Sequence, residues 1–468
     1  MVLWDRSAVE SLGFEVQGKW SDLEETVEFQ IDSRQVKPGN LFVALKGENL
    51  DGNRFVEAAF KQGAVGALVS LEFKNQGLVL LKNYPDRFLI LAPDSLRALG
   101  EWAAFHRRKF KDLVVIGVTG SNGKTTTKEM LAQLLQDLGP LYCTPGNFNS
   151  EIGLPLSVLQ LRNHHRVAVL EMGMNHKGEM GWITSVALPQ MALITNIGSA
   201  HIGILGSREA IAKEKKAIFS HFHKNSVGVI PRESDFFDFL GRDIVGKVLD
   251  FGNDDAQGVK DLGVEGTEFI WRGQKFHLPI PGKHNFSNAL GALTVAEALG
   301  VKVESMAQKL GQVHSLMGRF QIVKGAYTLV KDYYNANLDS MRALLDWVRE
   351  LEWPGRVVGV LGSMRELGAK TDEFHRQLFQ DSLSVNWGEL YFFGEEARVC
   401  LDEAVRLGRP DFQVKWTVNI DELCTWVLDS LRPGDLVVIK GSRGVALERL
   451  AEKLEVQSQK EALTAHVL

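Results

Sequence analysis

One glycine-rich segment constrains the fold of this chain more than any other feature. An apolar run over residues 114–118 leads into Thr119-Gly120-Ser121-Asn122-Gly123-Lys124-Thr125-Thr126, and a helical pattern follows over 128–138. This order predicts a strand, a loop whose backbone N–H groups face phosphates, and a helix whose N-terminus attracts anions. Lys124 would add a positive charge, and a threonine hydroxyl would hold Mg²⁺. Val118 takes the place of the first glycine of the strict motif, but the strand–turn–helix context favours a phosphate site over a turn without a ligand.

Composition limits the classes of protein that the chain can belong to. Its 468 residues suggest roughly two to four domains, and a 45% hydrophobic content supports ordinary cores. A net charge of −5 without a dominant basic patch argues against nucleic acid as a partner. Three widely spaced cysteines suit a reducing cytosol, and we find neither a signal sequence nor a membrane span. We therefore expect a cytoplasmic protein, and a monomer, because no apolar stripe demands a partner chain.

Strand and helix patterns alternate along the whole chain, which predicts an α/β protein of three domains with mainly parallel sheets. We place the domains at residues 1–111, 112–318 and 319–468. In the first domain the expected strands are 41–45, 65–69 and 88–92, with a helix after Asp94. In the central domain the expected strands are 167–170, 191–195 and 227–230, and the expected helices are 128–138, 209–222 and 286–299. The last dozen residues are expected to be weakly ordered.

Two polar side chains follow central strands, at the edge where ligands of open α/β sheets collect. Glu171 comes directly after strand 167–170 and is placed to bind the same Mg²⁺ as the loop threonine; an acid that caps a helix is the alternative. His201 follows strand 191–195 by a few residues. An isolated histidine is usually a surface or core residue, but its position at this edge favours a role in the site.

Lys215 is the fourth feature of the predicted site. On a helix, it shares one narrow apolar face with Ile211, Ile218 and Phe222, while Lys213 and Lys216 point away. A desolvated lysine loses proton affinity and can act as a neutral nucleophile. Such an amine can capture CO₂ as a carbamate, which is an anionic metal ligand. A lysine whose ammonium snorkels to solvent fits the spacing equally well.

A set of short motifs runs along the chain in a fixed order. They are Asp32-Ser33-Arg34 with the segment 38–47, the loop 119–129, Gly146-Asn147-Phe148-Asn149, Glu171-Met172-Gly173-Met174-Asn175-His176, Ala200-His201, Pro281-Gly282-Lys283-His284-Asn285, Gly318-Arg319-Phe320, Tyr334-Asn335-Ala336-Asn337 and Lys440-Gly441-Ser442-Arg443. In these motifs the chain resembles the Mur ligases, the ATP-dependent amide-forming enzymes of peptidoglycan precursor synthesis. The resemblance covers nearly the whole chain. It implies a small N-terminal α/β domain, a central P-loop domain and a C-terminal Rossmann-like domain.

The resemblance also implies ATP and two Mg²⁺ ions as cofactors. The phosphates and the first ion would be held by Gly120, Ser121, Asn122, Gly123, Lys124, Thr125 and Thr126, with Glu171 on that ion. His201 and carbamylated Lys215 would hold the second ion, so that Lys124, Glu171, His201 and Lys215 form the catalytic set. The remaining nucleotide contacts would come from Asn285, Asn288, Arg319 and Asp332.

The implied reaction joins D-alanyl-D-alanine to the peptide carboxylate of a UDP-N-acetylmuramoyl-tripeptide through an acyl phosphate. Domain 1–111 would bind the uridine diphosphate through Ser33, Arg34 and Lys46, and Asn147 and Asn149 would contact the muramoyl peptide. Domain 112–318 would bind ATP, and domain 319–468 would bind the dipeptide. The chain departs from the family pattern at Lys331, Tyr333, Leu338 and Ser363. The sequence therefore does not predict the details of the dipeptide pocket.

Three other functions compete with this interpretation. A sibling ligase would add a single amino acid, diaminopimelate or lysine, but the stretches 171–176 and 334–337 favour the dipeptide-adding member. A folate polyglutamate ligase lacks a domain ahead of the phosphate loop. A nucleotide-binding switch needs no second metal site, so Glu171, His201 and Lys215 argue against it. The third residue of the tripeptide stays open between diaminopimelate and lysine.

Overall fold

The computed structural model describes residues 2–24, 27–47, 49–408 and 414–465. They form two compact units: the first holds residues 1–117, 138–192 and 217–227, and the second holds 118–137, 193–216 and 228–468. Within the described ranges, no helix is both long enough and apolar enough to cross a bilayer.

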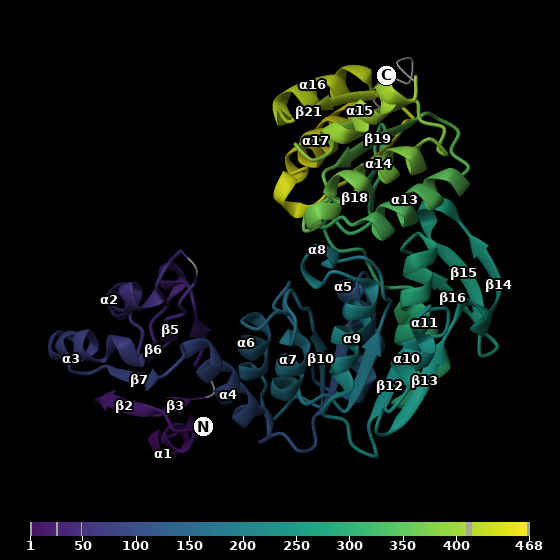
Figure 1. Ribbon diagram of the computed structural model, residues 1–468. Coiled ribbons are helices and arrows are strands. Elements are labelled where there is room, and N and C mark those ends of the chain that lie inside the picture. Colours follow the sequence, from purple (N-terminus) through teal and green to yellow (C-terminus); the bar gives the residue numbers. More distant parts are fainter. Residues whose placement is uncertain (1, 25–26, 48, 409–413, 466–468) are drawn as a thin grey trace. The chain divides into compact units, whose positions relative to one another are not determined.

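The N-terminal part is a five-stranded sheet in the order β2-β7-β6-β5-β4, with helices packed on it (Figure 1). The three expected strands are β5 (Leu41–Val43), β6 (Gly66–Ser70) and β7 (Phe88–Ala92), which pair in parallel. Strand β4 (Phe29–Gln30) adds in parallel and β2 (Glu15–Gly18) adds antiparallel. Asp94 caps helix α4 (Ser95–Arg107) as expected, because its Oδ1 accepts from the N–H of Leu96 at 2.8 Å. The sequence pattern did not predict α3 (Lys74–Asn83).

The central sheet has six strands in the order β13-β12-β11-β8-β10-β9. Their bounds are β8 (Val114–Thr119), β9 (Leu141–Cys143), β10 (Val167–Glu171), β11 (Met191–Ile194), β12 (Val227–Pro231) and β13 (Lys247–Phe251). Strand β8 runs into the glycine-rich loop, and helix α5 (Lys124–Leu134) begins four residues earlier than expected. A three-stranded antiparallel sheet, β14 (Ala256–Asp261), β15 (Thr267–Trp271) and β16 (Gln274–Leu278), was not predicted from the sequence. It is followed by α11 (Lys283–Ala298), close to the expected helix 286–299.

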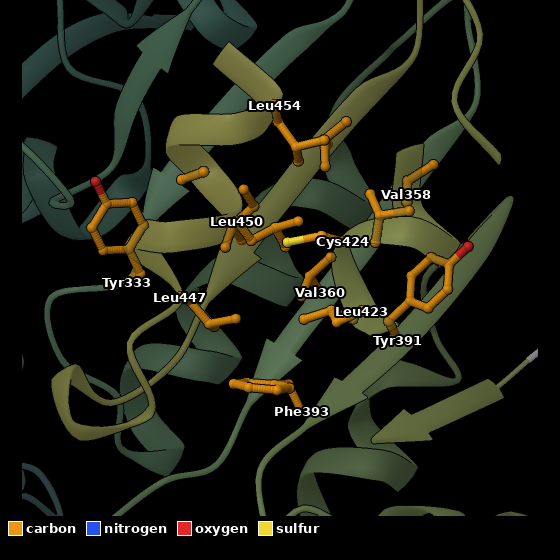
Figure 2. Close-up of a cluster of buried hydrophobic side chains, with 14 of the residues drawn as sticks. Tyr333, Val358, Val360, Tyr391, Phe393, Leu423, Cys424, Leu447, Leu450 and Leu454 are labelled. Carbon is orange, nitrogen blue, oxygen red and sulfur yellow. The ribbon is translucent and has the colours of Figure 1, made fainter. Parts of the chain in front are cut away.

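The C-terminal part is a second six-stranded sheet, β17-β18-β22-β19-β20-β21. All neighbours pair in parallel except β17 (Gln321–Val323), which is antiparallel to β18 (Thr328–Asp332). The other strands are β19 (Val357–Gly362), β20 (Glu389–Phe393), β21 (Val414–Thr417) and β22 (Leu436–Lys440). Helices α16 (Ile420–Ser430) and α17 (Glu448–Ala465) cover one buried cluster, in which Leu423 and Leu450 meet strand residues such as Val360 (Figure 2).

The C-terminal helix corrects the expectation of weak order for residues 457–465, because α17 continues to Ala465. Residues 466–468 of that expectation lie outside the described residues. Three contacts fasten α17 to β18 and to Tyr327, the residue just before that strand. Ser458 Oγ donates to the carbonyl of Tyr327 at 3.0 Å, and Tyr327 Oη donates to the carbonyl of Leu454 at 3.0 Å. Lys331 Nζ lies 2.7 Å from Oε2 of Glu455. The unusual lysine at 331 is therefore balanced by an acid on the helix beside it.

Candidate functional site

The phosphate loop is held in shape by the segment that follows β11. The N–H of Ser121 donates to the carbonyl of Asn196 at 3.1 Å, and the N–H of Asn122 donates to Oδ1 of Asn196 at 3.0 Å. Helix α5 starts at Lys124, so its first N–H groups have no acceptor within the helix and can face an anion. Lys124 Nζ donates to the carbonyl of Gly120 at 2.8 Å. The loop thus has the geometry predicted for a phosphate cradle.

Gly120 allows this geometry because Thr195 leaves no room for a side chain. A Cβ at position 120 would lie 1.8 Å from Oγ1 of Thr195, which itself donates to the carbonyl of Asn122 at 2.6 Å. We expect Gly120→Ala to displace Thr195, to weaken ADP binding at least about tenfold and to cost about 1–3 kcal/mol of stability. Calorimetric titration with ADP and thermal unfolding would measure both effects. The matched control is Gly181→Ala, where a Cβ meets open space; equal losses in the two variants would contradict the prediction.

Lys215 is buried on helix α9 (Arg208–Lys216), with 1% of its surface exposed, whereas Lys213 is exposed. This burial excludes a snorkelling ammonium, which would have to reach water. Desolvation lowers the pKa of Lys215 well below its ordinary value, and the positive charge of Lys124 lowers it further. The structure therefore places a lysine that favours its neutral, nucleophilic form within the electrostatic reach of the phosphate loop.

His201 belongs to the same unit as the loop and Lys215. It lies just before the short helix α8 (Ile202–Leu205), with a left-handed backbone at φ 65°. Its Nδ1 is 3.0 Å from Oε2 of Glu366. The sequence analysis did not predict Glu366 as a site residue.

Two further C-terminal residues touch the loops around the phosphate cradle, and sequence reasoning did not assign either of them to the site. Asn337 caps helix α13 (Leu338–Glu350), and its Nδ2 donates to Oδ1 of Asn122 at 2.7 Å. Asp339 Oδ2 accepts from the hydroxyl of Ser199 at 2.7 Å. The first turn of α13 therefore contacts the phosphate loop and the loop after β11. The sequence signal that could have indicated this helix start was an asparagine suited to an N-cap, followed two residues later by an acid.

Glu171 and Asn149 form a pair in the first unit. Glu171 is 1% exposed at the end of β10, and its Oε1 accepts from Nδ2 of Asn149 at 2.6 Å. It does not cap the next helix, α7 (Glu179–Ala187), whose N-cap is Gly178. Oε2 of Glu171 is buried and has no hydrogen-bond partner among the described residues. A buried carboxylate oxygen without a partner is costly unless it meets a cation, so this side chain fits a Mg²⁺ ligand.

No group of three or more His, Cys, Asp or Glu side chains forms a ready metal cage within the described part of the chain. Mg²⁺ commonly binds through one or two carboxylates together with substrate phosphates and water, so a full protein cage is not required. The convergence of Glu171 with His201 and Lys215 stays a prediction.

The residues expected to contact the rest of the nucleotide are already engaged within the protein. Asn285 donates from Nδ2 to the carbonyl of Pro281 at 2.7 Å, and Asn288 lies against Gly123, where a Cβ would approach it to 2.5 Å. Asp332 accepts from Nζ of Lys440 at 2.6 Å. The guanidinium of Arg319 stacks on the ring of Tyr334, 3.8 Å from its centroid. These contacts fix the side chains in place.

The residues expected to bind the sugar-nucleotide substrate lie on exposed segments. Ser33 is the first residue of a short 3₁₀ turn, and the next residue, Arg34, forms an ion pair with Asp32 at 2.7 Å. Lys46 forms an ion pair with Glu72 at 3.1 Å. Asn147 is exposed. Surface ion pairs contribute little stability, so these cations can exchange their partners for an anionic ligand at small cost.

The departures from the family pattern belong to the packing of the C-terminal domain. Ser363 is fully buried, and its Oγ accepts from the N–H of Ala397 at 3.0 Å. Tyr333 is a member of the buried cluster in Figure 2. Leu338 is buried as the first residue of α13. Ser363 therefore bonds to the backbone beside it and supports the start of α15 (Arg398–Arg406).

Comparisons with known proteins identify the family of this chain. Residues 27–106, 118–296 and 318–443 match the models of the Mur ligase family catalytic domain, the Mur ligase middle domain and the Mur ligase glutamate ligase domain. The UDP-N-acetylmuramoyl-tripeptide–D-alanyl-D-alanine ligase of Treponema pallidum is 39% identical over 90% of this chain and 92% of its own length. Crystal structure I of MurF from Acinetobacter baumannii is 28% identical with a TM-score of 0.85, covering 97% of this chain and 98% of its own. The MurF ligase of Thermotoga maritima in complex with ADP is 29% identical with a TM-score of 0.79, covering 95% of this chain and 100% of its own. These matches confirm the predicted resemblance and the three-domain α/β fold, and the chain belongs to the Mur ligase family.

Proposed function

We propose that this protein joins D-alanyl-D-alanine to the peptide carboxylate of a UDP-N-acetylmuramoyl-tripeptide, using ATP. The observation that carries the ligase class is a phosphate loop with Lys124 whose charge acts on a buried Lys215 of lowered pKa. The choice of substrates rests on the relative from Treponema pallidum, whose name states this pair. A protein that only bound a nucleotide would gain nothing from the costly burial of a lysine.

The reaction follows from the poor reactivity of a carboxylate. One oxygen of the substrate carboxylate attacks the γ-phosphorus of ATP, ADP leaves, and an acyl phosphate forms. The amine of the dipeptide then attacks the carbonyl carbon and loses a proton, and inorganic phosphate leaves as the amide forms. Lys124 and the N-terminus of α5 would hold the phosphates and offset the charge that accumulates as carboxylate and phosphate meet.

Mg²⁺ would be held by Thr125 and Glu171, and a second ion by His201 and carbamylated Lys215. The carbamate forms when the neutral amine of Lys215 adds to the carbon of CO₂ and releases one proton to solvent. When bound, the ions would neutralise charge on the phosphates and the substrate carboxylate. The unpartnered Oε2 of Glu171 supports the first assignment, and the burial of Lys215 supports the second.

We assign residues 1–111 to the sugar-nucleotide substrate, 112–318 to ATP and 319–468 to the dipeptide. Ser33, Arg34 and Lys46 would contact the diphosphate, and Asn147 and Asn149 would contact the muramoyl peptide. Asn285 and Asn288 would hold adenine, and Arg319 and Asp332 would close over the nucleotide. We propose the cytoplasm as the location, where ATP is available, and a monomer as the active form.

A substrate panel tests the proposed function. The purified chain with ATP and Mg²⁺ is offered UDP-muramoyl-tripeptides ending in diaminopimelate or lysine, and the UDP-muramoyl-dipeptide that lacks this third residue, each with D-alanyl-D-alanine or a single amino acid as the amine. We expect phosphate release and a pentapeptide product only with the dipeptide, and the better tripeptide identifies its third residue. A product only with a single amino acid on a shorter peptide would reassign the chain to a sibling ligase. ATP turnover that is independent of any carboxylate substrate would contradict a ligase.

A further inference from the structure

A short segment of the C-terminal domain packs directly on the loop that carries His201. Gly203 lies two residues after His201, and a Cβ there would approach the carbonyl oxygen of Glu366 and the amide nitrogen of Gly368 to 2.6 Å each. Helix α8 and the 3₁₀ turn Gly368–Lys370 are accordingly in contact. Both segments belong to the same compact unit. The absence of a side chain at position 203 allows the two backbones to meet.

This backbone contact brings one carboxylate to one imidazole nitrogen. Oε2 of Glu366 lies 3.0 Å from Nδ1 of His201, which is buried, although the pair does not meet hydrogen-bond geometry. Hydrogen bonds at catalytic sites are often misaligned before substrates bind and tighten afterwards. His201 and Glu366 also both have a left-handed backbone, at φ 65° and 64°. Such strain persists where the surroundings over-determine a position, and it concentrates at functional sites.

The pair can contribute by fixing the orientation of the His201 ring, and it contributes little to stability. The Glu366 side chain is 57% exposed, and an ion pair so open to solvent adds little stability. A histidine that binds a metal through one nitrogen, however, almost always donates the N–H of its other nitrogen to a carboxylate or carbonyl, which fixes the tautomer and the ring. Glu366 is the carboxylate in contact with Nδ1.

We propose that Glu366 is a positioning residue for His201: its carboxylate holds the proton on Nδ1 and so keeps Nε2 unprotonated and available to Mg²⁺. This inference rests on the metal-binding role of His201 in the proposed function. Because Glu366 belongs to the domain assigned to the incoming amine, His201 is prepared as a ligand only while residues 366–368 rest on Gly203. The metal site thereby depends on the domain that supplies the second substrate.

The tautomer of His201 gives a test that does not depend on turnover. ¹⁵N-histidine spectra of the metal-free protein are recorded for wild type, Glu366→Ala and Glu366→Gln, and the His201 signals are identified by their loss in His201→Gln. We expect the Nδ1–H form in wild type, a shift toward the Nε2–H form in Glu366→Ala, and retention of Nδ1–H in Glu366→Gln, whose amide oxygen can still accept. Glu373→Gln, on helix α14 (Thr371–Ser382), is the matched control and should leave the signals unchanged. An unchanged tautomer in Glu366→Ala would overturn the proposal.

The Mg²⁺ requirement gives the second readout. We expect Glu366→Ala to raise the Mg²⁺ concentration for half-maximal turnover by about 10–100-fold, with a smaller rise in Glu366→Gln. A change below about twofold in a variant with normal circular dichroism would overturn the proposal. If Glu366→Ala fails to fold, Glu366→Met decides, because its side chain has a similar length but no carboxylate: a Mg²⁺ requirement equal to that of wild type in this variant would overturn the proposal. Absence of product from wild type, together with the expected tautomer shift, would instead contradict the proposed function and leave the role of Glu366 intact.

Discussion

Replacement of Lys215 by alanine is expected to lower turnover by about 10²–10³-fold, the effect of removing one preorganised electrostatic group from an active site. The side chain is buried, and desolvation lowers its pKa, which shifts the amine toward the neutral form that can attack CO₂. The variant would lose the proposed carbamate and with it the proposed anionic ligand for the second Mg²⁺. The fold should persist, because truncation also removes an amine that was costly to bury.

The neighbouring lysine provides the control for this experiment. Lys213 lies on the same helix but is exposed, so Lys213→Ala should keep turnover within about twofold of wild type, as surface substitutions usually do. A carbamate signal from ¹³C-bicarbonate should appear in wild type and be absent from Lys215→Ala. Near-normal turnover of Lys215→Ala would refute the role of this residue, and a carbamate signal that survives the substitution would assign the modification to another amine.

Glu171→Gln is expected to lower turnover by about 10²–10³-fold without loss of thermal stability. Oε1 keeps its hydrogen bond from Asn149, whereas the charge on the buried Oε2 disappears. A buried charge without a partner costs more than a neutral amide, so the metal-free protein should melt at the same temperature or higher. Turnover would thus fall while the melting temperature stays the same or rises. This combination is expected where a side chain destabilises the fold but is needed for activity.

Differential scanning calorimetry measures the contribution of Glu171 to Mg²⁺ binding. In wild type, Mg²⁺ with ADP should raise the melting temperature above the value with ADP alone, and Glu171→Gln should lose most of that increment. Glu101→Gln, an exposed substitution in the same unit, is the control and should keep it. A full Mg²⁺ increment in Glu171→Gln would show that the ion is bound elsewhere.

The features that sequence reasoning predicted well are those with a local physical signal. The phosphate loop combines a strand, glycines and a helix within about twenty residues, and its geometry is as predicted. The place of Lys215 on the apolar face of its helix followed from the spacing alone, but its burial, which decides between a snorkelling and a desolvated lysine, required the structure. Asp94 was recognised as a cap because its side chain acts on its own neighbours.

The features that were missed depend on contacts between distant segments. Glu366 meets His201 across 165 positions, and no periodic pattern reports such a meeting. Strands β14, β15 and β16 are an exception: they follow one another in the chain, and β15 and β16 alternate between buried and exposed positions, so a local signal was present and was overlooked. The last dozen residues were expected to be weakly ordered, but α17 continues to Ala465, and Ser458 within them bonds to Tyr327, just before β18. Tertiary packing decided the meeting of Glu366 with His201 and the order of the terminal helix, and local composition did not.

The contact between β18 and α17 has a consequence for evolution and for engineering. Lys331 departs from the family pattern, in which the resemblance to the Mur ligases implies an aspartate at this position. Glu455, which balances the charge of Lys331, lies more than a hundred residues later in the chain. A graft of the relatives' strand into this background would set two acids against each other. We therefore expect β18 and α17 to be exchanged as a pair in engineered variants. A recombinant that joins α17 of this chain to β18 of a relative should require a change at Glu455 as well.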